Sequence, residues 1–230
     1  QSITDSFTAV SSDGTSSQLV TVTIHGTNDA PAITGTSSGS VTEDVAVVSN
    51  NISTSGKLDI ADADQLQSNF TVQSGTAGSN GYGTFTLAAD GAWTYTADNS
   101  KTAIQQLGAT QSITDSFTAV SSDGSASKTV TVTINGTNDV PVIGGVYVGA
   151  VTEDANATLT TGGALTISDV DQGQSNFAAA TFTGLYGTFT LVADGNWTYA
   201  ADNSQTAIQQ LGATQSITDS FTAVSSDGTS

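Results

Sequence analysis

Apolar and polar residues alternate along several short stretches of this chain. Val130, Val132 and Ile134 are separated by threonines, and Phe85 and Leu87 are separated in the same way. A period of two residues is typical of β-strands that turn one face to a core and the other to solvent. In residues 30–139 this pattern predicts seven antiparallel strands, at roughly 32–42, 56–62, 69–74, 83–88, 92–97, 112–121 and 128–136.

Turn signals separate these strands. The stretches "ADG" at 89–91 and "SSDGSAS" at 121–127 are typical of hairpin turns. One short helix is expected at 100–108, with Ser100 as its N-cap and Gly108 as its end. Seven short strands with frequent turns favour an antiparallel β-sandwich.

The same sequence segments recur along the chain. "QSITDSFTAVSSDG" begins at Gln1, at Gln111 and at Gln215, and residues 98–124 differ from residues 202–228 at one position only. Such spacing indicates repeats of domain size. We therefore expect residues 1–29 to be the last two strands of one repeat, 30–139 to be a complete repeat, and 140–230 to supply strands one to six of another without its last strand.

The charge of the chain is strongly negative. Three lysines and no arginine stand against 21 acidic residues, which gives a formal net charge of −18. A protein that binds the phosphate backbone needs a positive field, so nucleic acid and anionic membrane surfaces are excluded as partners. Charge of this size favours a medium rich in salt or bound cations that neutralise acidic clusters.

The chain contains no cysteine and no methionine, which suits an oxidising environment outside the cell. No signal peptide, lipidation motif or membrane-spanning run is found in these residues, so membrane insertion is not expected.

The order of the motifs resembles a known repeat. "GTNDAP", "SVTED", "LDIADAD", "YGTFTLAADGAWTYTADN" and "TVTVTING" follow one another as in the VCBS repeat of giant bacterial surface proteins. That resemblance implies tandem seven-stranded Ig-like or cadherin-like β-sandwiches in an elongated array. It also implies secretion to the bacterial cell surface, as in adhesins of the RTX type, and stiffening by Ca²⁺.

In a sandwich of this topology, successive loops lie at alternate ends, so the acidic motifs gather beside the linkers. Asp62, Asp64 and Asp123 are expected near the linker Asn28–Asp29. Glu43 and Asp44 are expected at the opposite end, near the linker Asn138–Asp139. The following repeat offers Asp169, Asp171 and Asp227 to that same linker, and it repeats the acidic pair as Glu153 and Asp154.

Ca²⁺ suits such clusters because it takes six to eight oxygen ligands in flexible geometry, whereas Mg²⁺ fits them less well. The candidate ligands are Asn28, Asp29, Glu43, Asp44, Asp62, Asp64, Asp123, Asn138, Asp139, Glu153, Asp154, Asp169, Asp171 and Asp227. The competing interpretation is that these residues only end strands and solvate turns.

The positions of several other residues indicate structural roles. Asp90 and Asp194 lie in "ADG" turns, and Asp115 is expected to point inward and accept hydrogen bonds from the preceding loop. Trp93 and Trp197 share strand parity with tyrosines, which favours core packing over sugar stacking. His25 is expected at an exposed edge.

These observations predict a non-enzymatic stalk that is joined to neighbouring repeats of the same long protein. One alternative is a module that binds carbohydrate or protein through Tyr82, Tyr147 and Tyr186. Another is a spacer within a large secreted enzyme, whose catalytic residues would lie elsewhere.

The ends of the chain leave two interpretations open. In the first, these residues are a window on a longer array, and 1–29 form a hairpin with few other contacts. In the second, Ser17–Asp29 of one chain completes the last repeat of another by strand addition, which gives a head-to-tail fibre. The duplication of Gln1–Gly14 at Gln215–Gly228 favours the first, because both segments compete for the sixth-strand position.

Overall fold

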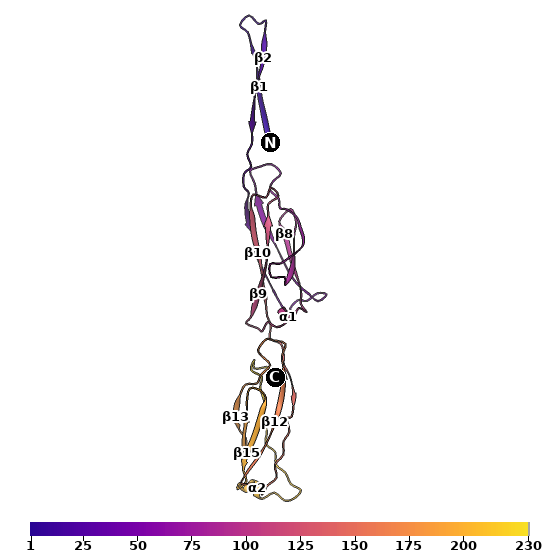
Figure 1. The fold of residues 1–230 in the computed structure, drawn as a ribbon, viewed down its shortest axis with the longest axis vertical. Helices are drawn as coiled ribbons and strands as arrows, with labels where there is room; N and C mark the ends of the chain where they lie inside the picture. Colours follow the sequence, from indigo (N-terminus) through magenta and orange to yellow (C-terminus); the bar gives the residue numbers. More distant parts are fainter. Residues whose placement is uncertain (230) are drawn as a thin grey trace. The chain divides into compact units, whose positions relative to one another are not determined.

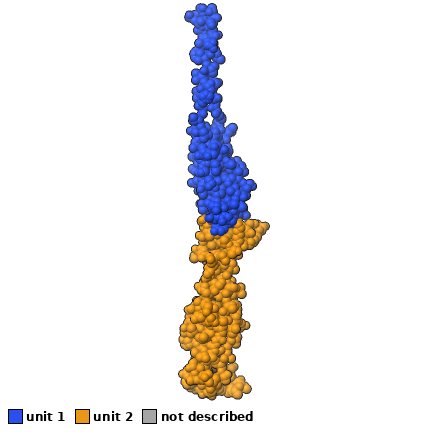
Figure 2. Space-filling model, viewed as in Figure 1, with its two compact units in different colours: residues 1–39, 53–96, 115–132 blue, residues 40–52, 97–114, 133–230 orange. Residues whose placement is uncertain are grey.

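A computed structural model describes residues 1–229, and its regular structure is almost entirely β-strand (Figure 1). The chain forms two compact units (Figure 2). Unit 1 comprises residues 1–39, 53–96 and 115–132, and unit 2 comprises 40–52, 97–114 and 133–230.

The first two strands form a hairpin within unit 1. β1 (Ser2–Val10) and β2 (Ser17–His25) pair antiparallel over their whole length, from Ser2 opposite His25 to Val10 opposite Ser17. Both strands are exposed along both faces, and His25 is exposed as expected. The expected hairpin is confirmed.

Two sheets carry the strands of residues 30–139. In the order of their hydrogen bonding, the five-stranded sheet contains β3 (Ala32–Gly35), β5 (Asn51–Ala61), β8 (Ala92–Asp98), β7 (Gly83–Leu87) and β6 (Gln73–Ala77). The three-stranded sheet contains β4 (Ser38–Thr42), β10 (Ser127–Asn135) and β9 (Ser112–Val120). The antiparallel, all-β class expected from the sequence is confirmed.

The prediction of a single strand at 32–42 is wrong, because this segment forms two strands in different sheets. Gly35 has a φ of 86°, a left-handed conformation in which a Cβ would lie 2.7 Å from the Lys57 carbonyl oxygen. Beyond it, the Thr36 amide still donates to Lys57, whereas the Ser37 carbonyl accepts from the Thr131 amide of β10. The chain therefore changes sheets at this glycine, and the count becomes eight strands.

Three further elements differ in their bounds from the prediction. The strand predicted at 56–62 begins five residues earlier, as β5 at Asn51–Ala61. The strand predicted at 69–74 is β6 at Gln73–Ala77, because the Phe70 and Thr71 amides donate to Ala89 and Val120, outside the β6–β7 pairing. The helix predicted at 100–108 is the single turn α1 (Thr102–Gln105). Its N-cap is Lys101, since Ser100 is bonded to the Asp98 carboxylate instead.

Aromatic rings form the core of unit 1. The Phe85 ring centroid lies 4.6 Å from that of Tyr95 and 4.6 Å from that of Phe117. Trp93 is buried and its indole N–H donates to the Thr36 carbonyl at 2.8 Å. Trp197 makes the equivalent bond, which confirms that both tryptophans are core residues.

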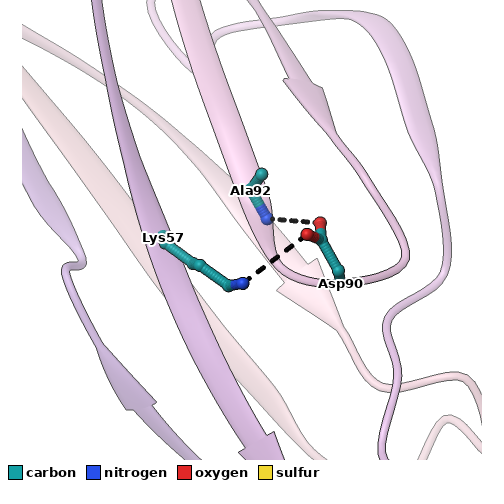
Figure 3. Close-up of polar contacts among 3 residues, drawn as sticks. All are labelled: Lys57, Asp90 and Ala92. Carbon is teal, nitrogen blue, oxygen red and sulfur yellow. Dashed lines mark hydrogen bonds and ion pairs between the residues drawn. The ribbon is translucent and has the colours of Figure 1, made fainter.

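The "ADG" turn between β7 and β8 is drawn in Figure 3. Asp90 Oδ1 accepts from the Ala92 amide at 3.1 Å, and Oδ2 lies 3.5 Å from Lys57 Nζ. The Ala92 bond and then the lysine lower the pKa of Asp90. Because the ion pair is exposed, it contributes little to stability, and Asp90 is a turn residue as expected.

Residues 140–230 form one five-stranded sheet within unit 2. Its order is β11 (Val142–Gly145), β12 (Thr158–Ser168), β15 (Asn196–Asp202), β14 (Gly187–Leu191) and β13 (Ala180–Thr183), and α2 (Thr206–Gln209) follows. Phe189, Trp197 and Tyr199 are buried on its inner face.

The prediction of six strands in this part of the chain is wrong. Residues 148–152 and 216–224 correspond to β4 and β9, yet neither forms a strand. In the three-stranded sheet β10 lies between β4 and β9 and pairs with both. Among residues 140–229 no strand takes the place of β10, so the two segments lack a shared hydrogen-bonding partner there.

Asp115 anchors the loop between β6 and β7. It is fully buried; its Oδ1 accepts from the Asn80 amide at 2.9 Å, and its Oδ2 accepts from Gly83 at 2.9 Å and from the Tyr95 hydroxyl at 3.3 Å. Burial, and then the Asp115 charge, raise the pKa of Tyr95, so its hydroxyl stays protonated and donates. The inward role expected of Asp115 is confirmed.

We expect Asp115→Ala to lower the free energy of unfolding of this core by about 3 kcal/mol, because it leaves buried donors without an acceptor. Asp5→Ala is the matched control, since Asp5 has the same sequence neighbours but is exposed and accepts only from Ser6. We expect it to change stability by less than about 0.5 kcal/mol. Denaturant unfolding of both variants checks this, and equal effects would contradict the assignment.

Candidate metal centres

Two aspartates of one turn lie beside the linker Asn138–Asp139 in unit 2. Asp171 is 1% exposed, and its Oδ2 accepts from the Asp139 amide at 2.9 Å. The Asp171 amide in turn donates to Asp169 Oδ1 at 2.9 Å. These bonds leave Asp169 Oδ2 and Asp171 Oδ1 buried without a hydrogen-bond donor.

Glu43 approaches the same linker from the end of β4. Its side chain is fully buried, and Oε1 accepts from the Thr137 amide at 2.9 Å. Its own amide donates to the Asn135 carbonyl at 3.0 Å, so the backbone holds it in place. Oε2 is buried without a donor.

The carboxylates around the linker Asn138–Asp139 raise one another's pKa values by electrostatic repulsion. Burial, followed by the charges of Asp44, Asp139 and Asp171, raises the pKa of Glu43 to about 7. Burial also raises the pKa of Asp139, with added repulsion from Asp171, Asp44 and Asp169. Without a cation, this end of unit 2 therefore holds negative charge against a desolvation cost.

Asn138 links Asp227 to the same region. Its amide nitrogen donates to Asp227 Oδ2 at 2.8 Å and to the Asp139 carbonyl at 2.8 Å. Asp227 also accepts from Ser225 and Thr229. Burial opposes the effect, but these bonds lower the pKa of Asp227, which keeps it ionised.

Asp44 and Asp154 face partners inside their own repeats. Asp44 Oδ1 accepts from Asn99 at 2.6 Å and from Gln105 at 3.0 Å. Asp154 Oδ1 accepts from Asn203 at 3.3 Å and from Gln209 at 3.1 Å. Glu153 is half-buried.

The linker Asn28–Asp29 carries a second cluster, in unit 1. The Asp29 amide donates to Asp64 Oδ2 at 2.8 Å, and the Asp64 amide donates to Asp62 Oδ1 at 2.9 Å. Asn28 donates to Asp123 Oδ2 at 2.9 Å. The linker is exposed here, whereas Asn138 and Asp139 are half-buried.

Two glutamines belong to these clusters and were missed from the sequence. Gln67 and Gln174 each follow the second aspartate of the D-x-D turn by three residues, and each has a buried Oε1 without a donor. The signal was the retention of glutamine in "DADQLQS" and "DVDQGQS" although the neighbouring residues change.

Within residues 1–229, all the buried side-chain nitrogen and oxygen atoms that have no hydrogen-bond partner belong to these clusters. They are Glu43 Oε2, Asp62 Oδ2, Gln67 Oε1, Asp169 Oδ2, Asp171 Oδ1 and Gln174 Oε1. Every one is an oxygen that can accept and not donate, so a cation satisfies them directly. Carboxylate and amide oxygens are the ligands that Ca²⁺ prefers.

The side chains are not arranged as a finished cage. Within residues 1–229, no three Asp, Glu or His side chains have positions that would hold a metal ion as they stand. Asp64 and Asp171 instead accept from linker amides, and glutamine oxygens supply part of the unpartnered set. Turning the carboxylate side chains toward an ion costs far less than leaving buried charge unpaired, so the unpartnered oxygens favour a bound cation.

A family model for the bacterial cadherin-like domain matches residues 28–136 and 138–230. Among solved structures, protocadherin gamma B7 extracellular cadherin domains 1–4 give a TM-score of 0.45 at 13% identity, covering 91% of this chain and 51% of that one. The human desmocollin-1 ectodomain gives 0.38 at 12% identity, covering 96% and 47%. The chain thus spans about half of the length of these structures.

No curated protein matches the chain. Within residues 1–229, neither helix has the length or apolar character needed to cross a membrane.

The buried Glu43 makes stability depend on pH when no metal is present. The pKa of Glu43 in the folded protein is raised from 4.5 to about 7. The stability that Glu43 contributes is therefore fully present below about pH 4.5 and is lost as pH rises through 7. In chelator we expect the free energy of unfolding to fall by roughly 2 kcal/mol between about pH 5 and about pH 8.

The variant Glu43→Gln removes the titrating group and should flatten this profile. Glu153→Gln changes the same position of the next repeat, where the side chain is half-buried, and should leave the profile as in the parent. Chemical denaturation at each pH measures both. A Glu43→Gln profile that matches the parent would show that another group carries the dependence.

Proposed function

The chain belongs to the family of bacterial cadherin-like domains, and from this membership and its linker carboxylates we propose that it is an extracellular structural segment of a bacterial surface protein. In this proposal Ca²⁺ binds at the linkers Asn28–Asp29 and Asn138–Asp139 and makes them rigid. The segment performs no catalysis and serves to hold other parts of its parent protein away from the surface.

One observation supports the proposal most strongly. The six buried oxygens without a donor gather beside the two linkers. At the second linker they come from both sides of Asn138–Asp139, since Glu43 precedes it and Asp169, Asp171 and Gln174 follow it. A cation shared by these oxygens joins residues 30–139 to residues 140–230.

The expected mechanical effect follows from this cross-link. An empty linker leaves carboxylates that repel one another, which favours open and variable linker conformations. A bound Ca²⁺ removes that repulsion and holds both sides in a single arrangement. The ion therefore controls stiffness, and calcium in the surrounding medium keeps the segment extended.

The contacts of the aromatic residues do not favour a sugar-binding role. Tyr147 is 79% exposed, but Tyr82 and Tyr186 are half-buried and both tryptophans are in cores. The three tyrosines therefore do not offer an open stacking surface. Asp64 and Asp171 accept from linker amides, which suits a linker role better than acid and base catalysis.

We expect Ca²⁺ to narrow the range of linker conformations, as measured by small-angle scattering in chelator and in calcium. Asp169→Ala with Asp171→Ala should abolish this response at the second linker only. Asp194→Ala is the matched control, since Asp194 accepts only within its own turn. Scattering that is unchanged by calcium in the parent chain would contradict the proposal.

The same ion should stabilise the fold by mass action. At free calcium about a hundred times the dissociation constant, the gain is about 2.7 kcal/mol per site. Thermal unfolding at increasing calcium should therefore show a rising Tm, and the Asp169→Ala, Asp171→Ala pair should reduce the rise. A Tm independent of calcium would favour the interpretation of these aspartates as turn residues.

A further inference from the structure

The chain contains five copies of the pattern N-x-S/T, which is the acceptor motif for sugars linked to asparagine in secreted proteins. They lie at residues 51–53, 69–71, 135–137, 156–158 and 196–198. A transferase must reach the asparagine amide and the hydroxyl two residues later at the same time. The pattern is therefore usable in the folded protein only where the whole tripeptide is exposed and the amide is free.

Four of the five motifs are closed by the fold. Their middle residues, Ile52, Phe70, Gly136 and Trp197, are buried. The side-chain amide of each asparagine in these four motifs also donates a hydrogen bond. The acceptors of these bonds are the carbonyls of Ser49, Leu66 and Val41, and Asp194 Oδ2.

The motif at residues 156–158, within unit 2, differs in both respects. Asn156, Ala157 and Thr158 are all exposed. Within residues 1–229, the side-chain amide of Asn156 has no hydrogen-bond partner. Thr158 is the first residue of β12, so Asn156 and Ala157 precede the strand and lie outside its pairing with β15. This motif therefore meets both requirements for modification.

Asn203 holds both sides of the loop that carries Asn156. Its Oδ1 accepts from the Asp154 amide at 3.2 Å, and its Nδ2 donates to Asp154 Oδ1 at 3.3 Å. The backbone amide of Asn203 donates to the Ala157 carbonyl at 3.0 Å. Gln209 of α2 also donates to Asp154 Oδ1, at 3.1 Å. The loop is thus fixed on either side of Asn156, while the Asn156 side chain is free to enter an enzyme.

The exposure of this loop has a parallel in the middle repeat. Residues 45–50 follow the same acidic pair there, and all of them are exposed. They are exposed although a further repeat, residues 140–230, follows in the same chain. The presence of a following repeat therefore leaves a loop at this position accessible.

We propose that Asn156 is the acceptor of an N-linked sugar, which a glycosyltransferase transfers from a donor that carries the sugar on a phosphate at C1. Asn156 Nδ2 forms a bond to C1, the C1–O bond to the phosphate breaks, and the phosphate leaves with the electron pair. Nδ2 gives up one proton to a base of the enzyme. The proposal rests on the extracellular role proposed above, because N-linked sugars belong to secreted proteins.

Asn196 is a control within the same repeat. Asp194 stands two residues before it, just as Asp154 stands two residues before Asn156, and a threonine follows each asparagine by two residues. Asn196, however, is the first residue of β15, and its neighbour Trp197 is in the core. The two motifs therefore share their acidic residue and their hydroxyl but differ in accessibility.

The test incubates the folded full chain with a bacterial oligosaccharyltransferase and an oligosaccharide on a lipid pyrophosphate, and mass spectrometry of glycopeptides locates the sugar. We expect modification of Asn156 to exceed that of Asn196 by at least roughly tenfold, because Asn196 is reached only when the sheet opens. Peptides of residues 152–160 and 192–200 have no such fold, and both should be modified.

Two variants check the assignment to this motif. Asn156→Gln should remove the sugar, and so should Thr158→Val, which removes the hydroxyl but keeps a strand-forming residue at the start of β12. Thr158→Ser restores a hydroxyl and should be modified. Because both side chains are exposed, all three variants should unfold at the Tm of the parent.

Three results would overturn the proposal. They are a folded chain without sugar at Asn156 although the peptide of residues 152–160 is modified, rejection of that peptide by the enzyme, and equal modification of Asn156 and Asn196 in the folded chain. The calcium response of the linkers is measured separately by scattering. A chain that responds to calcium but carries no sugar would therefore contradict this inference alone, and a glycosylated chain without a calcium response would contradict only the linker function.

Discussion

Buried oxygen atoms without hydrogen donors set the constraint on which the rest of this structure depends. An unpaired buried carboxylate is costly, and such groups otherwise protonate or pair with a cation. Here they gather at Asn28–Asp29 and Asn138–Asp139, the linkers between repeated motifs. Without an ion, burial and mutual repulsion raise the pKa of Glu43 and of Asp139. A chain with a net charge of −18 has few cations of its own to offer, so the compensating charge must come from outside.

One sequence occurs in three environments and forms a strand in only two of them. "SITDSFTAV" is an exposed strand at Ser2–Val10, a strand with a buried face at Ser112–Val120, and a segment outside any strand at Ser216–Val224. Local propensity is identical in the three copies, so the differences arise from their neighbours. At Ser112–Val120, both β10 and a covering sheet are present, and the strand has a buried face. At Ser216–Val224 no neighbouring strand is present among residues 1–229, and the hydrogen-bonding ladder of a strand does not form. Asp219 still accepts from the Tyr186 and Gly187 amides, so the loop anchor forms without the strand.

Much of the fold could be predicted from alternation and turns. β7, β8, β9 and β10 lie within one residue of their expected bounds, because each has a regular apolar face and a clear turn beside it. The change of sheet at Gly35 was missed, because residues 34–40 contain only Thr, Gly and Ser, so no apolar alternation marks where one strand ends and the next begins. The loss of strands at 148–152 and 216–224 was also missed, because their counterparts β4 and β9 both depend on pairing with β10, and alternation within a segment does not reveal this dependence. At the candidate sites the aspartates stand out by spacing, whereas Gln67 and Gln174 are neutral, and the sequence marks them only by their retention in both repeats.

A crystal structure of the chain grown with Ca²⁺ tests the central claim most directly. The account predicts an ion at the second linker, identified by its anomalous signal, about 2.3–2.6 Å from oxygens that include Glu43 Oε2, Asp169 Oδ2 and Asp171 Oδ1. Water molecules or side-chain donors bonded to these same oxygens, with no ion in the presence of calcium, would contradict it.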